Sequence, residues 1–346
     1  MSSYAQELQA TAQAMMAPGK GILAMDESHA TANKRFEKLG IPTTEERRRT
    51  YRELILTTPN LSDFISGAIL FDETIRQSTQ AGMPFVQLMQ QVGIIPGIKL
   101  DMGAKPLANF PGETVTEGLD GLRDRIAEYY QMGARFAKWR AVITIGDGIP
   151  TAASLEANAH ALARYAALCQ EGGLVPIVEP EVLIDGDHSI ERCYEVTNET
   201  LQAVFHQLRL YRIAFDQMIL KPSMVISGLS SPTQASPEQV ADETIRCLLN
   251  NVPVTVPGVA FLSGGQTYEQ ASQHLQIMNA KYSDRCPWRV TFSYARAIQQ
   301  PALDHWQGND ANIQAAQQLL YHRAKMNGAA SMGQYKPEME KEPALA

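Results

Sequence analysis

Charged side chains stand inside several apolar stretches of this 346-residue sequence. The run RFAKWRAVI places Lys138 and Arg140 two positions apart, and LVPIVEPEV does the same for Glu179 and Glu181. Side chains two positions apart in a β-strand point to the same face. Each run would therefore present two like charges on one face, and cations that face carboxylates can hold a charged substrate and move protons.

Other charged residues occur in the same kind of position. They are Asp26, Lys99, Lys221 and Arg296, so that eight charged residues fall at the ends of six apolar runs. Burying a charge is unfavourable unless it is paired. Any one of these residues could form a structural ion pair, and Lys138–Glu179 and Arg140–Glu181 pairs would partly do so, but eight together indicate a site.

The signs of these charges favour an anionic, phosphorylated substrate. Five basic residues against three acidic ones leave two excess positive charges in a chain of net charge −7. In FLSGGQ, Ser263, Gly264 and Gly265 form a turn whose backbone N–H groups can approach a phosphate closely. Ser293 and Arg296 follow the last apolar run, and the loops after the seventh and eighth strands commonly bind phosphate in barrels.

A second anion site is predicted from DESHATANKR. Ser28, Thr31 and Arg35 follow Asp26 there, and Lys99 could reach them. A helix N-terminus capped by Ser28 is the structural alternative, and the two interpretations are compatible.

The chemistry open to this set is Schiff-base formation with a carbonyl. A lysine must lose its proton to attack, and both burial and nearby cations favour that loss. Lys221 follows Met218-Ile219-Leu220 and would lie near Lys138, although Lys138 and Lys99 are rival nucleophiles on the sequence alone. Glu179 could transfer the protons.

A metal is not expected to take part. The seven histidines lie outside the apolar runs and form no HxxH or HExxH pattern, and the four cysteines form no CxxC pair. Metal sites usually need such clusters. We therefore predict neither a metal nor a cofactor.

Eight short apolar runs supply the elements that must position these residues. They are nearly continuous rather than alternating, as in strands buried on both faces, and they span 21–26, 64–71, 93–100, 135–143, 174–182, 217–222, 257–265 and 288–294. Helix-like stretches occupy 3–17, 44–56, 151–171, 189–210, 236–249, 267–280 and 309–327.

Strand–helix repeats of this number predict a single (β/α)8 TIM barrel with the charged residues at the carboxyl ends of its strands. A doubly wound sheet is the alternative, but no GxGxxG follows the first run. We expect the barrel over 1–335, including an extra N-terminal helix, and a short mobile tail over 336–346, which lacks periodicity.

Composition narrows the partners and the compartment. The chain is 45% hydrophobic and 19% charged, as in ordinary globular proteins, and has no basic block beyond Arg47–Arg49. Nucleic acid and anionic membranes are therefore not expected as partners. No apolar run is long enough to span a membrane, and the N-terminus lacks the pattern of a signal peptide, which indicates a cytoplasmic protein.

Together the motifs resemble class I fructose-bisphosphate aldolases. GKGILAMDES, GAILFDET, PGIKLDMG, ARFAKWR, VPIVEPEVLIDGDH, ILKPSMV, FLSGGQ and FSYARA occur in order between about Tyr4 and Tyr335, with a texture closer to plant-plastid members than to animal ones. The resemblance implies a homo-oligomer, often a tetramer. It also implies metal-independent, reversible cleavage of fructose 1,6-bisphosphate to dihydroxyacetone phosphate and glyceraldehyde 3-phosphate, in glycolysis, gluconeogenesis and the Calvin cycle.

The resemblance further implies a role for each candidate residue. Lys221 would be the Schiff-base nucleophile, Glu179 the general acid and base for imine formation, and Asp26 the group at the C4 hydroxyl. Lys138 would also be catalytic: together with Arg140 and Glu181 it would position the substrate and tune Lys221. The C1 phosphate would be held by Ser263, Gly264, Gly265, Ser293 and Arg296, and the far phosphate by Ser28, Thr31, Arg35 and Lys99.

This chain departs from the family pattern at three places. Ala295 stands where animal members have glycine, and the sequence ends in Glu-Pro-Ala-Leu-Ala instead of the usual tyrosine, its last tyrosine being Tyr335. A third and smaller departure is Thr31, which replaces a serine but keeps the hydroxyl. Three rival functions are a transaldolase-like lyase with Lys138 as the covalent lysine, a phosphosugar isomerase, and a catalytically silent scaffold. A buried lysine argues against the scaffold, which has no use for one.

Overall fold

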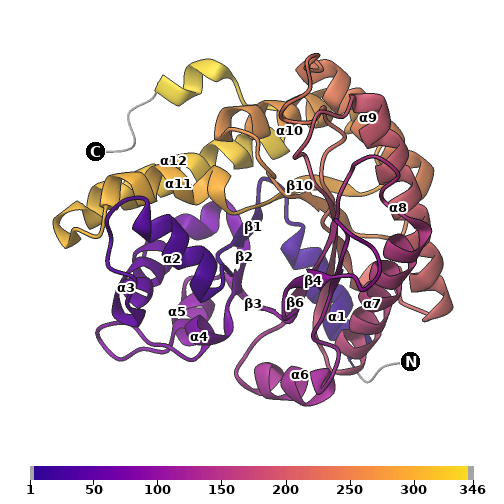
Figure 1. The fold of residues 1–346 in the computed structure, drawn as a ribbon. Coiled ribbons are helices and arrows are strands. Elements are labelled where there is room, and N and C mark those ends of the chain that lie inside the picture. Colours follow the sequence, from indigo (N-terminus) through magenta and orange to yellow (C-terminus); the bar gives the residue numbers. More distant parts are fainter. Residues whose placement is uncertain (1–3, 342–346) are drawn as a thin grey trace.

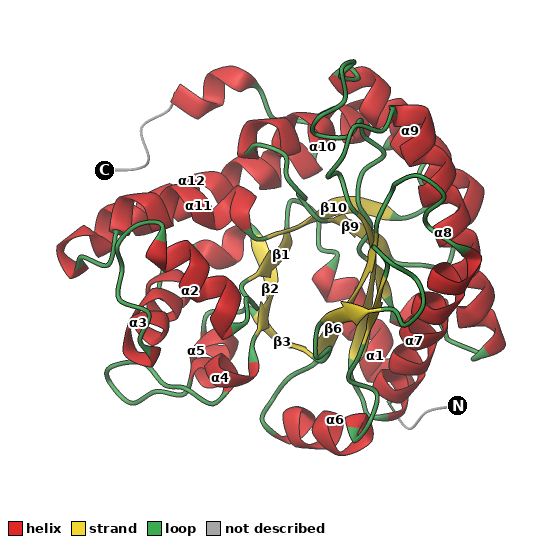
Figure 2. Cartoon of the chain, in the orientation of Figure 1, coloured by secondary structure: helices red, strands yellow, loops and turns green. Residues whose placement is uncertain are grey.

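The computed structural model describes residues 4–341, and a closed barrel of eight parallel strands forms its centre (Figures 1 and 2). The strands are β1 (Gly21–Ala24), β2 (Ile65–Leu70), β3 (Ile95–Lys99), β6 (Phe136–Ile143), β7 (Val175–Val182), β8 (Ile219–Leu220), β9 (Gly258–Phe261) and β10 (Arg289–Tyr294). Each pairs with the next along the chain, and β10 closes on β1. Every predicted run holds one strand, so the barrel is confirmed and the doubly wound sheet is wrong.

The expected helices are present with slightly shifted ends. They are α1 (Ala5–Met15), α3 (Glu45–Leu56), α7 (Ala152–Glu171), α8 (Ile190–Leu210), α9 (Pro237–Asn251), α10 (Tyr268–Tyr282) and α12 (Ile313–Ser331). Their starts follow the capping chemistry of the sequence. Ser236 caps α9 and forms a capping box with Gln239, while Pro237 takes the first helical position.

Several elements are additional to those expected. They are α2 (His29–Glu37), capped by Ser28, α4 (Asp72–Ile75), α5 (Phe85–Gln91), α6 (Leu122–Gln131), α11 (Arg296–Trp306), and a hairpin of β4 (Ala104–Pro106) and β5 (Thr114–Thr116). Helices as short as α4 carry too few turns to show an apolar stripe. Pro301 lies inside α11 and obscures the helical pattern there.

The barrel wall separates two apolar clusters. The interior is filled by side chains such as Phe136, Ile177 and Ile219, which pack with Leu8 and Met15 of α1. The extra N-terminal helix therefore belongs to the core of the barrel.

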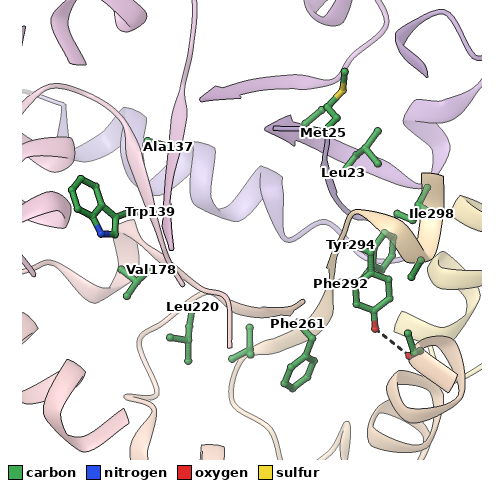
Figure 3. Packing of buried hydrophobic residues seen from close by; sticks show 14 of the residues in the cluster. Leu23, Met25, Ala137, Trp139, Val178, Leu220, Phe261, Phe292, Tyr294 and Ile298 are labelled. Carbon is green, nitrogen blue, oxygen red and sulfur yellow. Dashed lines mark hydrogen bonds between the residues drawn. The ribbon is translucent and has the colours of Figure 1, made fainter. Parts of the chain in front are cut away.

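The outer cluster lies between the strands and the helix layer (Figure 3). Trp139 belongs to it, while Lys138 and Arg140 on either side of Trp139 line a cavity inside the mouth. Tyr294 also packs outward, where its hydroxyl donates to the Ala271 carbonyl at 3.1 Å. Because side chains alternate along the strand, Trp139 packs against the helix layer whereas Lys138 and Arg140 line the cavity at the mouth, as the sequence predicts.

The C-terminal segment differs from the expected mobile tail over the part that the structure describes. Pro337–Lys341 form the short helix η4, and Tyr335 is buried. Glu340 accepts hydrogen bonds of 2.5 and 2.6 Å from Nη1 of Arg323 in α12. This ion pair and the packing of Tyr335 and Met339 in and against the core hold the segment. Two apolar side chains in so short a segment give no helical period, so the sequence pattern misses it. Residues 342–346 lie outside the described residues, and the division at 335/336 stays a prediction.

Candidate active site

A cavity of about 370 Å³ lies at the carboxyl ends of the barrel strands. Of the predicted site residues, all except Arg35 and Gly265 are among the residues that line it within 4–341. Those that do are Asp26, Ser28, Thr31, Lys99, Lys138, Arg140, Glu179, Glu181, Lys221, Ser263, Gly264, Ser293 and Arg296. The topology therefore gathers residues from most of the barrel strands, as the strand-end pattern predicts.

Buried ion pairs connect the lysines and carboxylates of this cavity. Nζ of Lys138 lies 2.7 Å from Oδ2 of Asp26, 3.5 Å from Oε2 of Glu179 and 3.9 Å from Oδ2 of Asp101. Nζ of Lys221 lies 3.1 Å from Oε1 of Glu179. The Lys221 and Glu179 side chains are each only 4% exposed. Glu179 therefore contacts two lysines with its two oxygens, which suits a group that passes protons between neighbours.

Asp26 and Lys138 each stabilise the charged form of the other. Burial opposes ionisation of Asp26, but Lys138 and then Lys221 outweigh it and lower the pKa of Asp26 from 3.8 to about 2. Burial likewise opposes the charge on Lys138, yet Asp26, Glu179 and Asp101 raise the pKa of Lys138 well above its ordinary value. Lys138 is therefore a fixed cation and Asp26 a fixed anion at neutral pH.

The register of β6 and β7 produces the predicted pairing of cations with carboxylates. Arg140 lies opposite Glu179 in the sheet, and Val142 lies opposite Glu181. The Arg140 guanidinium forms an ion pair with Glu181. The structural component expected for these pairs is thus present in Arg140–Glu181 and in Lys138–Glu179.

The sequence analysis missed Asp101. Its carboxylate accepts hydrogen bonds from the backbone N–H of Gly103 at 3.1 Å and of Arg140 at 3.2 Å, and lies 3.3 Å from Nζ of Lys99. Asp101 stands two positions after Lys99, so the period of two that linked Lys138 with Arg140 was also the signal here.

The predicted excess of positive charge at the mouth is wrong. Asp101 and Glu27 also line the cavity, which brings its charged lining to five basic and five acidic residues. Glu27 is itself paired, because Arg35 lies 2.5 Å and Arg52 2.8 Å from its carboxylate oxygens. Which cations can bind a substrate anion therefore depends on which of them are paired with carboxylates, and not on an excess of positive charge in the cavity.

Ser263, Gly264, Ser293 and Arg296 gather at one side of the cavity. Gly264 has a φ of +57°, a conformation that glycine adopts without strain, in the turn after β9. Arg296 begins α11 and donates to the Gly264 carbonyl. Oγ of Ser293 is buried and has no hydrogen-bond partner among residues 4–341. A buried hydroxyl without a partner beside an arginine is well suited to an anionic ligand.

Gly265 is not among the residues of the described structure that line the cavity, although its neighbour Gly264 is. A Cβ at this position would meet Cδ1 of Ile184 at 3.0 Å and Cδ1 of Leu229 at 3.1 Å. This close packing against apolar side chains accounts for the glycine, and the predicted phosphate contact has no support from the cavity lining.

The second predicted anion site is assembled only in part. Oγ of Ser28 lies 3.2 Å from Oγ1 of Thr31, and both residues line the cavity. Ser28 also caps α2, so both interpretations of this residue agree with the structure. Arg35 does not line the cavity in the described structure, because its guanidinium binds Glu27 and, at 3.2 Å, Oε1 of Gln300.

Two general properties bear on partners. Within residues 4–341 no helix has both the length and the apolar content needed to cross a membrane. In the same residues no group of three or more His, Cys, Asp or Glu side chains is arranged to hold a metal ion.

Comparison with known proteins gives a consistent family. A family model for class I fructose-bisphosphate aldolase matches residues 7–345. A probable class 1 fructose-bisphosphate aldolase of Xanthomonas campestris is 60% identical over 96% of this chain and 99% of its own length. Fructose-bisphosphate aldolase 3, chloroplastic, of Arabidopsis thaliana is 49% identical over 99% of this chain and 86% of its own. Chloroplast members are thus among the relatives, as the motifs predict.

A solved structure agrees. Plasmodium falciparum fructose-bisphosphate aldolase, in complex with TRAP and a small-molecule inhibitor, superposes with a TM-score of 0.95 and 46% identity over 97% of each chain. The match of fold, length and sequence assigns the family: this chain belongs to the class I fructose-bisphosphate aldolases, lyases that cleave fructose 1,6-bisphosphate through a lysine Schiff base.

Proposed function

We propose that Lys221 is the lysine that forms the Schiff base with fructose 1,6-bisphosphate. The observation that carries the proposal is the contrast between two buried lysines: Lys138 contacts three carboxylates and Lys221 contacts one. An amine surrounded by three anions holds its proton and cannot attack a carbonyl. Lys99 is paired with Asp101 and, at 16%, is more exposed than either of the other two.

Glu179 is proposed to carry the protons of imine formation. Its Oε1 lies 3.1 Å from Nζ of Lys221, close enough to accept the ammonium proton and so free the amine. The amine then adds to the C2 carbonyl, and a proton passes from the nitrogen to the C2 oxygen to give a carbinolamine. When Glu179 returns its proton to the carbinolamine hydroxyl, that group leaves as water and the iminium ion forms. Lys138, whose Nζ lies 3.5 Å from Oε2, pairs with the carboxylate that is restored when Glu179 returns its proton.

Asp26 is proposed to accept the proton of the C4 hydroxyl. As that O–H bond breaks, the C4 carbonyl forms, the C3–C4 bond breaks, and its electron pair moves into the iminium nitrogen to give an enamine. Glyceraldehyde 3-phosphate leaves. Protonation of C3 and hydrolysis then release dihydroxyacetone phosphate and regenerate the Lys221 amine. A carboxylate with a pKa of about 2 is ionised throughout the physiological range.

Two anion sites are proposed at opposite sides of the substrate. Ser263, Gly264, Ser293 and Arg296 would hold the C1 phosphate, and Ser28, Thr31 and Lys99 the far one. Support comes from the partnerless Ser293 hydroxyl and from the guanidinium of Arg296 beside the Gly264 turn. We further propose a homo-oligomer, a tetramer by the family resemblance, that works in the cytoplasm.

Borohydride trapping tests the assignment of the covalent lysine. Reduction in the presence of dihydroxyacetone phosphate should add one triose unit at Lys221 in the peptide map. Lys221→Ala should lose both the label and cleavage of fructose 1,6-bisphosphate. An adduct on Lys138 in the native enzyme would overturn the proposal and favour the transaldolase-like alternative.

A further inference from the structure

Gln266 closes the turn that contains Ser263 and Gly264. Its backbone N–H and its side-chain Nε2 both donate to the Ser263 carbonyl, at 3.1 and 3.0 Å. The other end of the same side chain, Oε1, lies 2.6 Å from Nδ1 of His274 in α10. His274 is only 4% exposed. One buried imidazole thus ties the turn to the helix behind it.

The direction of these hydrogen bonds follows from the chemistry of the groups. The Ser263 carbonyl only accepts, so the amide nitrogen of Gln266 faces it and the amide oxygen faces His274. That oxygen also only accepts, so Nδ1 of His274 carries a proton. Burial lowers the pKa of His274 to about 4, with Glu238 opposing, and the ring is therefore neutral near pH 7.

We propose that His274 is a positioning residue for the C1 phosphate, acting through Gln266 on the turn at 263–266. This inference rests on the proposed role of that turn in phosphate binding. Without the imidazole donor, Oε1 of Gln266 would lose its hydrogen bond to His274. The side chain would then be free to rotate and leave the Ser263 carbonyl with only the backbone N–H of Gln266 as its donor in this turn. Ser263 and Gly264 line the cavity, so the shape of the turn sets where their polar groups meet the phosphate.

Three variants test the inference. His274→Leu fills the space but removes the donor, whereas His274→Asn keeps an N–H donor near the position of Nδ1. Gln266→Met breaks the same connection from the turn. The measurements are the dissociation constant of dihydroxyacetone phosphate, imine formation with unphosphorylated dihydroxyacetone, kcat and KM for fructose 1,6-bisphosphate, and the thermal midpoint.

The expected result is a selective loss of phosphate binding. His274→Leu and Gln266→Met should each raise the dissociation constant of dihydroxyacetone phosphate and the KM by about three- to tenfold, the effect of one hydrogen bond. Imine formation with dihydroxyacetone should stay at the wild-type level. His274→Asn should restore binding, and the double variant should be no worse than either single one, because both remove one connection.

Two outcomes overturn the inference. His274→Leu could weaken both ligands equally, or His274→Asn could fail as badly as His274→Leu; either would make His274 a structural residue. If His274→Leu does not fold, His274→Asn and Gln266→Met carry the same comparison. Arg296→Ala separates the two levels of the argument. If Arg296→Ala leaves the preference for dihydroxyacetone phosphate over dihydroxyacetone intact, the phosphate site itself is misplaced. If Arg296→Ala weakens that preference but the His274 and Gln266 variants do not, only the proposed role of His274 is wrong.

Discussion

Nζ of Lys138 lies 2.7 Å from Oδ2 of Asp26, so an ion pair joins β6 to the end of β1 across the mouth of the barrel. These strands are not neighbours, since β3 and β2 separate them in the barrel order. The pair helps to lower the pKa of the Asp26 carboxylate to about 2, although burial alone would raise it. The same pair helps to raise the pKa of Lys138 well above its ordinary value.

Lys138→Met should move the acid limb of the pH–rate profile. Without the Lys138 ammonium, only Lys221 and Lys99 still oppose the effect of burial, so the pKa of Asp26 should rise from about 2. A carboxyl that must be ionised then limits the rate at higher pH, so the acid limb of kcat/KM should move up by about one unit or more. We also expect kcat to fall by on the order of 10²–10⁴, the usual contribution of acid–base chemistry.

The matched control for that variant is Lys99→Met. Lys99 contacts Asp101, and its effect on Asp26 is smaller than that of Lys138 or Lys221. The acid limb of kcat/KM should therefore move less in Lys99→Met than in Lys138→Met. Equal shifts in the two variants, measured between pH 4 and 9, would show that Asp26 does not depend on the 2.7 Å pair.

Arg296→Ala should weaken phosphorylated ligands selectively. The variant loses a charge-assisted hydrogen bond worth about 1.5–3 kcal/mol, which is roughly tenfold to over a hundredfold in binding. Arg296→Lys should recover only part of this, because an ammonium lacks the planar fork of donors. The comparison is between fructose 1,6-bisphosphate and unphosphorylated ketoses. Equal losses on both would mean that Arg296 supports the fold.

Much of the site could be predicted, because the alternation of side chains along a strand and the order of the strands in the barrel determine where a residue lies. Lys138, Arg140, Glu179 and Glu181 lie on two neighbouring strands, so alternation alone brings them to one mouth. The same rule covers Asp101, and the predicted charge surplus is wrong because it left out both Asp101 and Glu27.

Contacts across the barrel and side-chain directions could not be predicted in this way. The spacing of residues in the sequence does not show that Lys138 lies closer to Asp26 than to Glu179, because those two distances depend on how the barrel closes. Arg35 was assigned to the cavity from its place after Asp26, but its partner Glu27 draws it elsewhere. The connection between Gln266 and His274 joins a turn to a helix and leaves no periodic signal.

Cleavage should not depend on a divalent metal. In the proposed mechanism the iminium nitrogen takes up the electron pair of the C3–C4 bond, so no Lewis acid is needed at the carbonyl. Prolonged dialysis against EDTA should leave kcat unchanged within the error of a coupled assay. A rate that collapses with EDTA and returns on adding zinc would contradict the Schiff-base assignment.

The C-terminal segment should stabilise the fold without serving the chemistry. Glu340 binds the buried Arg323, and His322 and Arg323 outweigh burial to lower the pKa of Glu340 from 4.5 to about 2. A depressed pKa of this kind contributes stability that is complete above about pH 4.5 and is lost as pH falls toward 2. Glu340→Gln should therefore lower the free energy of unfolding at pH 7 by about 1.5–3 kcal/mol, the range for hydrogen bonds to charged groups.

The pH dependence distinguishes this ion pair from simple packing. The gap in thermal midpoint between wild type and Glu340→Gln should be largest from pH 6 to 7 and should narrow as pH falls from about 4.5 toward 2, because Glu340 of the unfolded wild-type chain takes up a proton there before the folded chain does. Truncation after Lys336 removes Glu340 and should produce a similar loss of stability. Glu340 is absent from the cavity lining, so both variants should cleave fructose 1,6-bisphosphate within about threefold of wild type, less than ~0.7 kcal/mol of barrier. A gap that stays constant with pH would show that the ion pair contributes nothing, and a hundredfold loss of cleavage would show that the segment enters the active site.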